Sequence, residues 1–287
     1  MAQDKIRVKD TNWELFSERP NSLNYISEDG KWMLKTDGAL LQNSKEDLLK
    51  EKELTDTIRA LGLPTPIIKE VFQMEDGSWA TIYEYVKDKK SITRLLSEDP
   101  EHRDEWIKHM AKLVKKLHET EANTDKLPNQ KDRILSNLET LEYVNEEERK
   151  VLKDYILSIP DKTTCLHGDM QPGNYIHSPG GDFIIDIGAF SYGNPLFDLG
   201  NFYQFSHVDS NQGVQLVFRA DKETARAYFD MFIKHYYEGE SQEYIDARVQ
   251  EIKDVAIVSM LSHGNVAFAH VSIQKALRQW LDERMNK

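Results

Sequence analysis

The sequence predicts a mixed α+β protein of two lobes, in which a small β-rich lobe precedes a larger, mostly helical one. Short strand-like runs dominate as far as residue 86, and helical patterns dominate from about residue 92. One β patch at 163–188 interrupts the helical part. The 287 residues suffice for two lobes. We therefore predict an N-terminal lobe at 1–86, a C-terminal lobe at 87–287 and a cleft between them.

The first lobe is predicted to contain five strands and one helix. Strands are expected at 13–16, 23–27, 31–35, 67–73 and 79–86. Between the third and fourth strands, Ser44 with Asp47 three residues later resembles a capping box and predicts a helix start. Gly62 and Pro64 end that helix.

The second lobe is predicted to be helical apart from its β patch. Helices are expected at 103–121, 131–142 and 145–158, and again from about residue 197. The patch contains three short runs, which are "TTCL" at 163–166, "NYIHS" at 174–178 and "DFIIDIG" at 182–188. We expect these runs to form one small sheet.

Composition disfavours several classes of partner. The net charge of −12 and the pI of about 5.3 argue against DNA or RNA, which usually bind a basic face. Cys165 is the only cysteine, so it has no disulfide partner, and we expect it to be buried in a strand. The start "MAQDKIRVKD" has no apolar signal core, and no apolar run is long enough to span a membrane. We therefore expect a cytoplasmic protein without a nucleic-acid, membrane or protein partner.

The loop "HGDMQPGN" at 167–174 places a histidine, a carboxylate and a carboxamide on one short connection. If the three runs of the patch form one sheet, Asp169, Asn174 and Asp186 converge at its edge. Asn174 and Asp186 offer the hard oxygen ligands that suit Mg²⁺, and Asp169 can accept a proton from an attacking hydroxyl. A metal, a base and an interlobe cleft together favour phosphoryl transfer from a nucleotide.

The first lobe supplies a candidate for holding the nucleotide phosphates. Neither GxxxxGK[ST] nor GxGxxG occurs, so no glycine-rich phosphate loop is available. Lys35 ends the third strand and can reach the phosphates if a carboxylate on the following helix fixes it. Glu51 lies sixteen positions further on and shares a helix face with apolar residues, so we expect it to point toward the sheet. Glu53 is the alternative partner.

With these motifs in place, the sequence resembles the aminoglycoside phosphotransferase and choline kinase family, a branch of the protein-kinase-like fold. "HGDMQPGN" matches the family's H-G-D-x-x-P-x-N catalytic loop, and "IID" matches its metal-binding strand end. "NPLFDLGNF" matches its downstream G-x-P-x-x-D-L element. Lys35, Glu51 and "GLPTP" match its small-lobe pattern. The resemblance covers most of 13–205 and implies a bilobal protein-kinase-like fold.

This resemblance implies the central roles at the site. Asp169 would be the catalytic aspartate, while Asn174 and Asp186 would hold Mg²⁺. Lys35 with Glu51 would orient the phosphates of ATP, with GTP as the other candidate nucleotide.

The resemblance also implies supporting roles. Backbone groups near Glu84 and Val86, in the connector between the lobes, would meet the nucleotide base. Ser22 would contact the phosphates from the first hairpin loop, which contains no glycine. His167 and Asp198 would be structural and would brace the catalytic loop by hydrogen bonds.

The spacing after the catalytic loop favours a small substrate. Only eleven residues separate Asp186 from Asp198 and no A-P-E follows, which leaves no platform for a protein substrate. We therefore expect a Mg²⁺-dependent kinase that transfers the γ-phosphate of ATP or GTP to an alcohol group of a small molecule, such as an aminoglycoside or a choline-like alcohol. The alternative is a catalytically idle regulator that binds a nucleotide or metabolite. A protein kinase is less favoured.

Substrate selection is expected to come from residues 199–287. These hold 12 acidic and 10 basic residues, so they show no strong acidic concentration of the kind that a polycationic aminoglycoside would want. An aromatic run in this segment could box a quaternary ammonium, although its helical spacing more often indicates core. The run comprises Tyr228, Phe229, Phe232, Tyr236 and Tyr237. Choline, a sugar, methylthioribose, a macrolide and an amino acid derivative all stay open.

Overall fold

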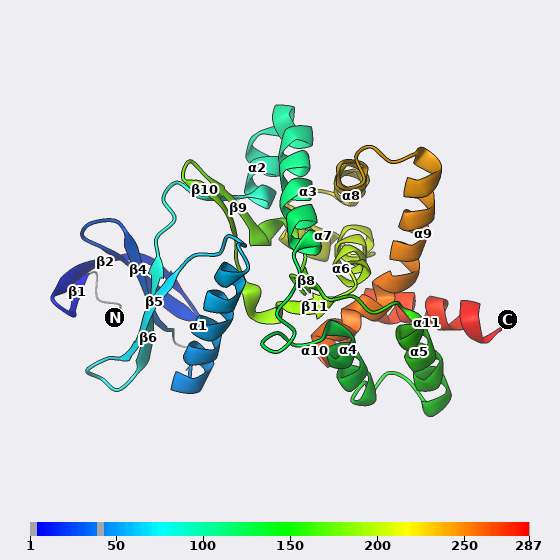
Figure 1. Ribbon diagram of the computed structural model, residues 1–287, viewed down its shortest axis with the longest axis horizontal. Helices are drawn as coiled ribbons and strands as arrows, with labels where there is room; N and C mark the ends of the chain where they lie inside the picture. Colours follow the sequence, from blue (N-terminus) through cyan, green and yellow to red (C-terminus); the bar gives the residue numbers. More distant parts are fainter. Residues whose placement is uncertain (1–4, 39–42, 287) are drawn as a thin grey trace. The chain divides into compact units, whose positions relative to one another are not determined.

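The computed structural model describes residues 5–38 and 43–286, which form two compact units (Figure 1). Unit 1 contains the described residues up to Lys89 together with Ile176–Gly188. Unit 2 contains Lys90–Tyr175 and the described residues from Ala189 onward. The fold is mixed α+β, as predicted, with an antiparallel sheet in unit 1 and a largely helical unit 2. None of the helices in these described ranges is both long and apolar enough to cross a membrane.

Unit 1 is built on an antiparallel sheet whose strands lie in the order β1-β2-β3-β4-β6-β5. Its strands are β1 (Lys5–Val8), β2 (Thr11–Arg19), β3 (Ser22–Ser27), β4 (Trp32–Asp37), β5 (Ile68–Gln73) and β6 (Trp79–Glu84). Helix α1 (Lys45–Ala60) connects β4 to β5, and Ser44 caps it by accepting a hydrogen bond from the Asp47 backbone at 3.1 Å. The predicted start of this helix at Ser44 is therefore confirmed, with Ser44 as its N-cap.

The prediction of five strands was one short, because β1 was missed. Ile6 of β1 pairs with Trp13 of β2 across a turn made by Lys9 and Asp10, whose φ angles are 50° and 61°. Such left-handed turns are normally signalled by Asn-Gly or Asp-Gly, and Lys-Asp gives no such signal. β2 and β3 are also longer than expected, which leaves only Pro20 and Asn21 in the first hairpin turn.

The second segment of unit 1 carries the residues around Asp186. Strands β9 (Tyr175–Ser178) and β10 (Gly181–Ile184) are neighbours in a sheet, and a 3-10 turn, η3 (Ile187–Ala189), follows them. The backbone N–H of Ile184 donates to the Pro64 carbonyl at 2.7 Å, which ties β10 to the chain that follows α1. Asp186 lies two residues beyond this hydrogen bond.

Unit 2 consists mainly of helices. They are α2 (Ile92–Glu98), α3 (Arg103–Glu119), α4 (Gln130–Glu139), α5 (Glu146–Ser158), α6 (Leu196–His207), α7 (Asn211–Phe218), α8 (Lys222–Tyr236), α9 (Gln242–Ser259), α10 (Gly264–Phe268) and α11 (Val271–Met285). Three 3-10 turns lie between them, η1 (Pro100–His102), η2 (Pro172–Asn174) and η4 (Met260–His263). The strands in this part of the chain are β7 (Lys90–Ser91), β8 (Thr164–Leu166) and β11 (Ser191–Gly193).

The β patch does not form the single sheet that was predicted. β8 pairs antiparallel with β11, with Cys165 opposite Tyr192, whereas β9 is the neighbour of β10. The partner strand was not foreseen, because "SYG" is too short to show an alternating apolar pattern. Cys165 is buried in β8 as predicted. Burial, helped by the Glu121 carboxylate, raises the pKa of its thiol to about 12.

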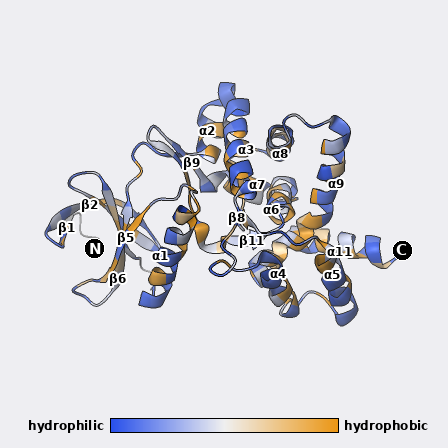
Figure 2. Ribbon diagram, viewed as in Figure 1, coloured by the Kyte–Doolittle hydropathy of each residue, from blue (hydrophilic) through white to orange (hydrophobic). Residues whose placement is uncertain are grey.

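The core of unit 2 forms where α6 contacts α9. A Cβ on Gly200 of α6 would lie 2.4 Å from Ser259 Oγ and 3.1 Å from Ala256 Cα, so the glycine permits this close approach. Figure 2 shows further hydrophobic residues gathered where α4, α10 and α11 meet. Phe202 of α6 packs on Phe232 of α8 with ring centroids 5.0 Å apart. The predicted aromatic run therefore contributes to the core, since Tyr228, Phe229 and Phe232 are all buried.

Candidate active site

The loop at 167–174 follows β8 and ends in η2, and a buried carboxylate on α6 holds its backbone. The N–H of His167 donates to Asp198 Oδ2 at 2.7 Å, and the N–H of Gly168 donates to Oδ1 at 2.8 Å. Asn201, one turn further along α6, donates its side-chain amide to the Gly168 carbonyl at 3.2 Å. The side chains of His167 and Asp198 are fully buried. Two residues of one helix therefore fix the path of the loop.

Asp198 is ionised because its surroundings stabilise the negative charge. Burial alone would raise the pKa of this carboxyl. The hydrogen bond with His118, at 3.1 Å from Nε2 to Oδ2, and the backbone donors outweigh burial, so the pKa lies below its ordinary value. His118 Nδ1 in turn lies 2.9 Å from the Tyr236 hydroxyl. This chain of three buried groups links α3, α6 and α8 beneath the loop.

Gly168 is required by the backbone of the loop. Its φ is 79°, a conformation that L side chains rarely adopt. A Cβ at this position would lie 2.1 Å from the Ala189 carbonyl oxygen and 2.8 Å from its carbon. Backbone atoms cannot move aside as a flexible side chain can, so no larger residue fits without shifting the loop.

Replacing Gly168 with alanine is expected to destabilise unit 2 and to disturb the loop. The control is Gly239→Ala, because Gly239 has a φ of 99° but no atom within 4 Å of the point that a Cβ would occupy. Left-handed strain alone costs about 1–2 kcal/mol, so urea unfolding should show that loss for Gly239→Ala and a clearly larger one for Gly168→Ala. Equal losses in the free energy of unfolding would mean that the clash with Ala189 adds no destabilisation.

Asp169 is the most exposed ionisable group of the loop, and its carboxylate is held from one side. Oδ2 accepts hydrogen bonds from Asn174 Nδ2 at 3.1 Å and from Gln171 Nε2 at 3.2 Å. Within the described ranges no residue donates to Oδ1. One oxygen is thus fixed and the other stays available as a proton acceptor. Gln171 was not foreseen, because the motif leaves the second position after the aspartate unspecified.

The structure brings Asn174 together with Asp169. Asn174 is buried, and its amide nitrogen donates to the Asp169 carbonyl at 2.8 Å as well as to the Asp169 side chain. Because the nitrogen is used in this way, the amide oxygen Oδ1 remains free of any donor in the described part of the chain. A free amide oxygen is a suitable ligand for a hard cation.

Asp186 belongs to unit 1 and is presented in an uncommon backbone conformation. Its φ is 55°, which is tolerated by Asp more readily than by most residues. The side chain is exposed and forms no ion pair with any residue that the structure describes. An exposed carboxylate of this kind is a suitable ligand for a hard cation.

Lys35 and Glu51 of unit 1 both lie close to Tyr83. The Tyr83 hydroxyl of β6 donates to Glu51 Oε1 at 2.9 Å, and Lys35 Nζ of β4 lies 6.0 Å from the centroid of the Tyr83 ring. Burial raises the pKa of Tyr83, with smaller contributions from Glu51 and Asp186. Glu51 is half-buried whereas Glu53 is exposed. Of the two candidates, Glu51 is therefore the carboxylate that faces the sheet.

Tyr83 was missed from the sequence, although strand alternation held a usable signal. Lys35 lies opposite Thr81 in the sheet, and Tyr83 lies two residues beyond Thr81 on the same face. The side chain of Lys35 forms no salt bridge with a described residue, so its ammonium is available to an anionic ligand.

The remaining predicted residues of unit 1 occupy strand ends. Ser22 begins β3, is buried, and accepts a hydrogen bond from Asn24 Nδ2 at 3.3 Å. Glu84 ends β6, and both its backbone N–H and its carboxylate bond to the backbone of Ile67 at 2.8 Å and 3.1 Å. Val86 follows two residues later, and its backbone has no hydrogen bond to any residue of the described ranges.

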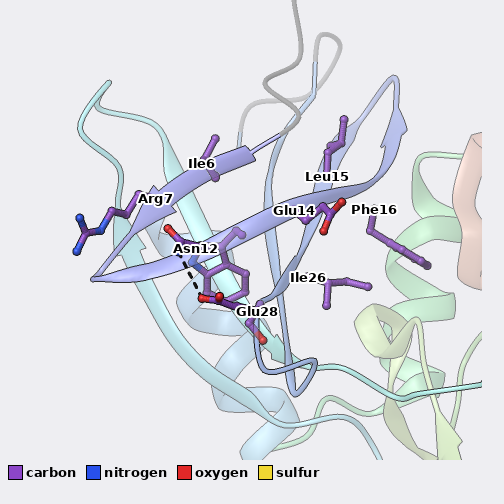
Figure 3. A pocket seen from close by; sticks show the side chains of 10 residues that line it. Ile6, Arg7, Asn12, Glu14, Leu15, Phe16, Ile26 and Glu28 are labelled. Carbon is purple, nitrogen blue, oxygen red and sulfur yellow. Dashed lines mark hydrogen bonds between the residues drawn. The ribbon is translucent and has the colours of Figure 1, made fainter.

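Of the two pockets described next, one in each unit, only the pocket in unit 2 is lined by a predicted site residue. A hollow of about 900 Å³ lies on strands β1 to β3 of unit 1, where Asn12 Nδ2 donates to Glu28 at 3.3 Å. Figure 3 shows side chains that line it. None of the predicted site residues lines it. In unit 2, a pocket of about 440 Å³ opens beside Asp169. Glu238, which follows α8, instead pairs with Lys108 at 2.7 Å and does not line this pocket.

Comparisons with known proteins identify the family of this chain. The family described as "Phosphotransferase enzyme family" matches residues 17–233. Because this match covers more than half of the chain, the chain belongs to the phosphotransferase enzyme family. Among curated proteins no sequence matches. Phosphoryl transfer is the class of reaction that defines this family, and the recognition made from the loop and strand motifs is confirmed.

Solved structures share the fold at low sequence identity. The GDP complex of aminoglycoside 2'-phosphotransferase-IIIa has a TM-score of 0.54 and 15% identity over 94% of this chain and 91% of that one. Amicoumacin kinase hAmiN, in complex with AMP-PNP, Ca²⁺ and Ami, has a TM-score of 0.57 and 14% identity over 94% and 87%. A choline/ethanolamine kinase family protein from Mesorhizobium loti has a TM-score of 0.51 and 17% identity over 96% and 85%. At these identities the likeness shows the fold alone.

Proposed function

We propose that the protein is a small-molecule kinase that transfers the γ-phosphate of ATP or GTP to a hydroxyl of its acceptor. The observation that carries this proposal is the state of Asp169. One carboxylate oxygen is held by Asn174 and Gln171, the other is free of donors in the described part of the chain, and the group lines a pocket of about 440 Å³. A fixed base at the wall of a small-molecule-sized pocket suits the activation of an alcohol.

In the proposed reaction Asp169 orients the acceptor hydroxyl and takes its proton on Oδ1. The oxygen of that hydroxyl attacks the γ-phosphorus in line, and the bond from phosphorus to the leaving diphosphate oxygen breaks. Asn174 and Gln171 hold the carboxylate still through Oδ2. Positioning of this kind supplies much of the rate in phosphoryl transfer, because the group that is transferred needs little covalent assistance.

Asn174 and Asp186 would hold Mg²⁺, which would neutralise charge on the phosphates when bound. Lys35 would contact the same phosphates, with Glu51 and Tyr83 holding its surroundings. Ser22 at the start of β3 would add a phosphate contact. The nucleotide base would meet the backbone near Glu84 and Val86, and the unbonded backbone of Val86 supports that assignment. We also propose a cytoplasmic protein, since ATP and Mg²⁺ are supplied there.

Glu51 and Glu53 provide a matched pair for testing the nucleotide side. Glu51→Gln is expected to raise the KM for ATP by about 10-fold, because a charged hydrogen-bonding partner near Lys35 is lost. Glu53→Gln should leave KM unchanged, because that side chain is exposed. Steady-state kinetics on both variants decides the assignment, and the reverse pattern would transfer the role to Glu53.

The experiment that tests the function is a coupled ADP-release screen over aminoglycosides, choline, ethanolamine, sugars and nucleosides, repeated with GTP. At least one acceptor should give release above the rate without acceptor, and EDTA should abolish it. Mass spectrometry of the product should show one added phosphoryl group. Tight nucleotide binding without turnover on any acceptor would instead favour an idle nucleotide-binding regulator.

A further inference from the structure

The pocket beside Asp169 is formed by segments of unit 2 that the sequence motifs do not cover. The end of α6, half of α7, η4, α10 and the start of α11 contribute to it. Half of its lining residues are apolar, including Phe205, Val208, Leu216, Met260, Val266 and Ile273. Leu216 and Val266 are 84% and 77% exposed, so the rim presents aliphatic side chains to solvent. Exposed large apolar side chains around a cavity are typical of a surface that binds ligands with apolar groups.

The charges of the pocket do not suit a polycation. Among its described lining residues Asp169 is the single carboxylate, and no lysine or arginine is present. A substrate with several ammonium groups would leave all but one of them without a counter-charge, next to aliphatic side chains that cannot solvate them. Phe205 is the single aromatic carbocycle in the lining, which is too few for an aromatic cage around a quaternary ammonium.

His263 supplies a specific polar contact in this largely apolar wall. Its Nε2 is buried and has no hydrogen-bond partner among the described residues. Its ring lies 6.1 Å from the Phe205 ring, and it is close enough to Asp169 to interact with that carboxylate electrostatically. Burial lowers the pKa of His263, which is the largest effect, so the imidazole is neutral near pH 7. A buried nitrogen without a partner, beside a pocket, calls for a hydrogen bond from a ligand.

We infer that the acceptor is an uncharged, hydroxyl-bearing compound with an apolar face, and that it forms a hydrogen bond with His263 Nε2. Its apolar face would lie against Leu216, Val266 and their neighbours, and its hydroxyl would meet Asp169 Oδ1. This inference rests on the proposed kinase function for the role of the hydroxyl. It differs from a choice based on the related structures, because a polycationic aminoglycoside does not fit this lining.

The first test measures binding without nucleotide, so that it does not depend on catalysis. Phenyl β-D-glucopyranoside serves as the neutral probe with an apolar face, kanamycin as the polycation and choline as the quaternary ammonium. Isothermal titration at two salt concentrations should give saturable binding of the glucoside. Kanamycin should bind at least about 10-fold more weakly, as expected when cations are desolvated without partners, and choline should also bind more weakly because the lining offers no aromatic cage. Kanamycin binding equal to or tighter than glucoside binding would overturn the inference.

Variants of two exposed leucines assign the binding to this pocket. Leu216→Asp should weaken binding of the glucoside by about 5-fold, because apolar contact is lost. It should strengthen binding of kanamycin. Leu157→Asp is the matched control, because Leu157 is 53% exposed on α5 and does not line the pocket. Both substitutions are at the surface, so the fold should persist. If Leu216→Asp changes neither ligand, the pocket is not the site.

His263 is tested by truncation and by conservative replacement. His263→Ala should weaken binding of the glucoside by about 5-fold, which is the contribution of one neutral hydrogen bond. His263→Gln should recover part of this affinity, because the glutamine amide can replace Nε2. Circular dichroism and thermal unfolding of each variant identify any loss of folding. If both variants fold and bind as the wild type does, His263 has no part in recognition.

Failure of the inference and failure of the proposed function give different results. If the glucoside binds at this pocket but neither it nor any other acceptor in the screen is phosphorylated, the kinase proposal falls and the pocket assignment stands. If kanamycin alone is phosphorylated, the kinase proposal stands and the inference about the acceptor falls.

Discussion

Replacing Asp169 with asparagine is expected to lower kcat by about 10²- to 10⁴-fold, the range that general bases contribute in enzymes. Asparagine has nearly the same shape, and its amide oxygen can still accept from Asn174 and Gln171. It cannot take a proton from the acceptor. Because the loop backbone is held by Asp198 and Asn201 and not by this side chain, the fold should be unaffected. The loss should therefore appear in the chemical step.

The measurement is steady-state ADP release with the best acceptor from the screen, together with nucleotide affinity by titration. The affinity for ATP should change by less than about 3-fold, since Asp169 is proposed to touch the acceptor and not the nucleotide. Asp125→Asn is the control, because Asp125 is an exposed aspartate of the same unit. A kcat that matches the wild type would remove Asp169 from the mechanism.

Replacing Asp198 with asparagine is expected to reduce the free energy of unfolding by about 3–5 kcal/mol, the usual loss when one partner of a buried charged network is removed. The side chain is fully buried and accepts from two backbone N–H groups and from His118. An asparagine has only one acceptor oxygen, so at least one of these donors would face an NH₂ group. Activity should fall with stability, because the same bonds position the catalytic loop.

The pH dependence of this loss has a definite sign. The pKa of Asp198 is lower in the folded protein than its ordinary value, so the carboxylate stabilises the fold at pH values above the unfolded pKa of about 3.9. That contribution disappears as the pH falls through the lower folded pKa. The difference in unfolding free energy between wild type and Asp198→Asn should thus be constant near neutrality and shrink in acid.

Urea unfolding at a series of pH values checks both expectations, with Asp282→Asn on the exposed side of α11 as the control. The control should lie within about 0.5 kcal/mol of the wild type throughout. If the difference for Asp198→Asn grew instead of shrinking below pH 4, the carboxyl would be neutral in the folded state.

The proximity of Asp169 and Asn174 could be predicted from the sequence because the two residues belong to one short loop. Asp169 and Asn174 lie five positions apart, and the hydrogen bonds between them follow from one tight segment. The capped start of α1 was readable for the same reason. By contrast, β8 pairs with β11, and His118 reaches Asp198 across eighty positions of chain. No periodicity or turn signal reports such distant partners.

The residues that escaped prediction belong to the walls of the sites. Tyr83 reaches Glu51 from another strand, and His263 lies at the end of a 3-10 turn far along the chain from Asp169. Their roles depend on burial and on which neighbour lies opposite, and a single sequence does not contain that information. The roles of Lys35, Asp186 and the other site residues stay predictions.

The Asp198 carboxylate, which anchors the loop at 167–174, lies in the first turn of α6. The walls of the pocket beside Asp169 come from the last turn of that helix and from α7 and α10. Under the proposed function, the loop anchor and the walls that would select the acceptor are thus encoded by different stretches of the gene. Substitutions that reshape the walls need not disturb the anchor, so we expect new acceptors to be accessible by single substitutions. Libraries confined to the exposed wall residues Gln212, Leu216, Val266 and His270 should yield altered preferences while most members still fold.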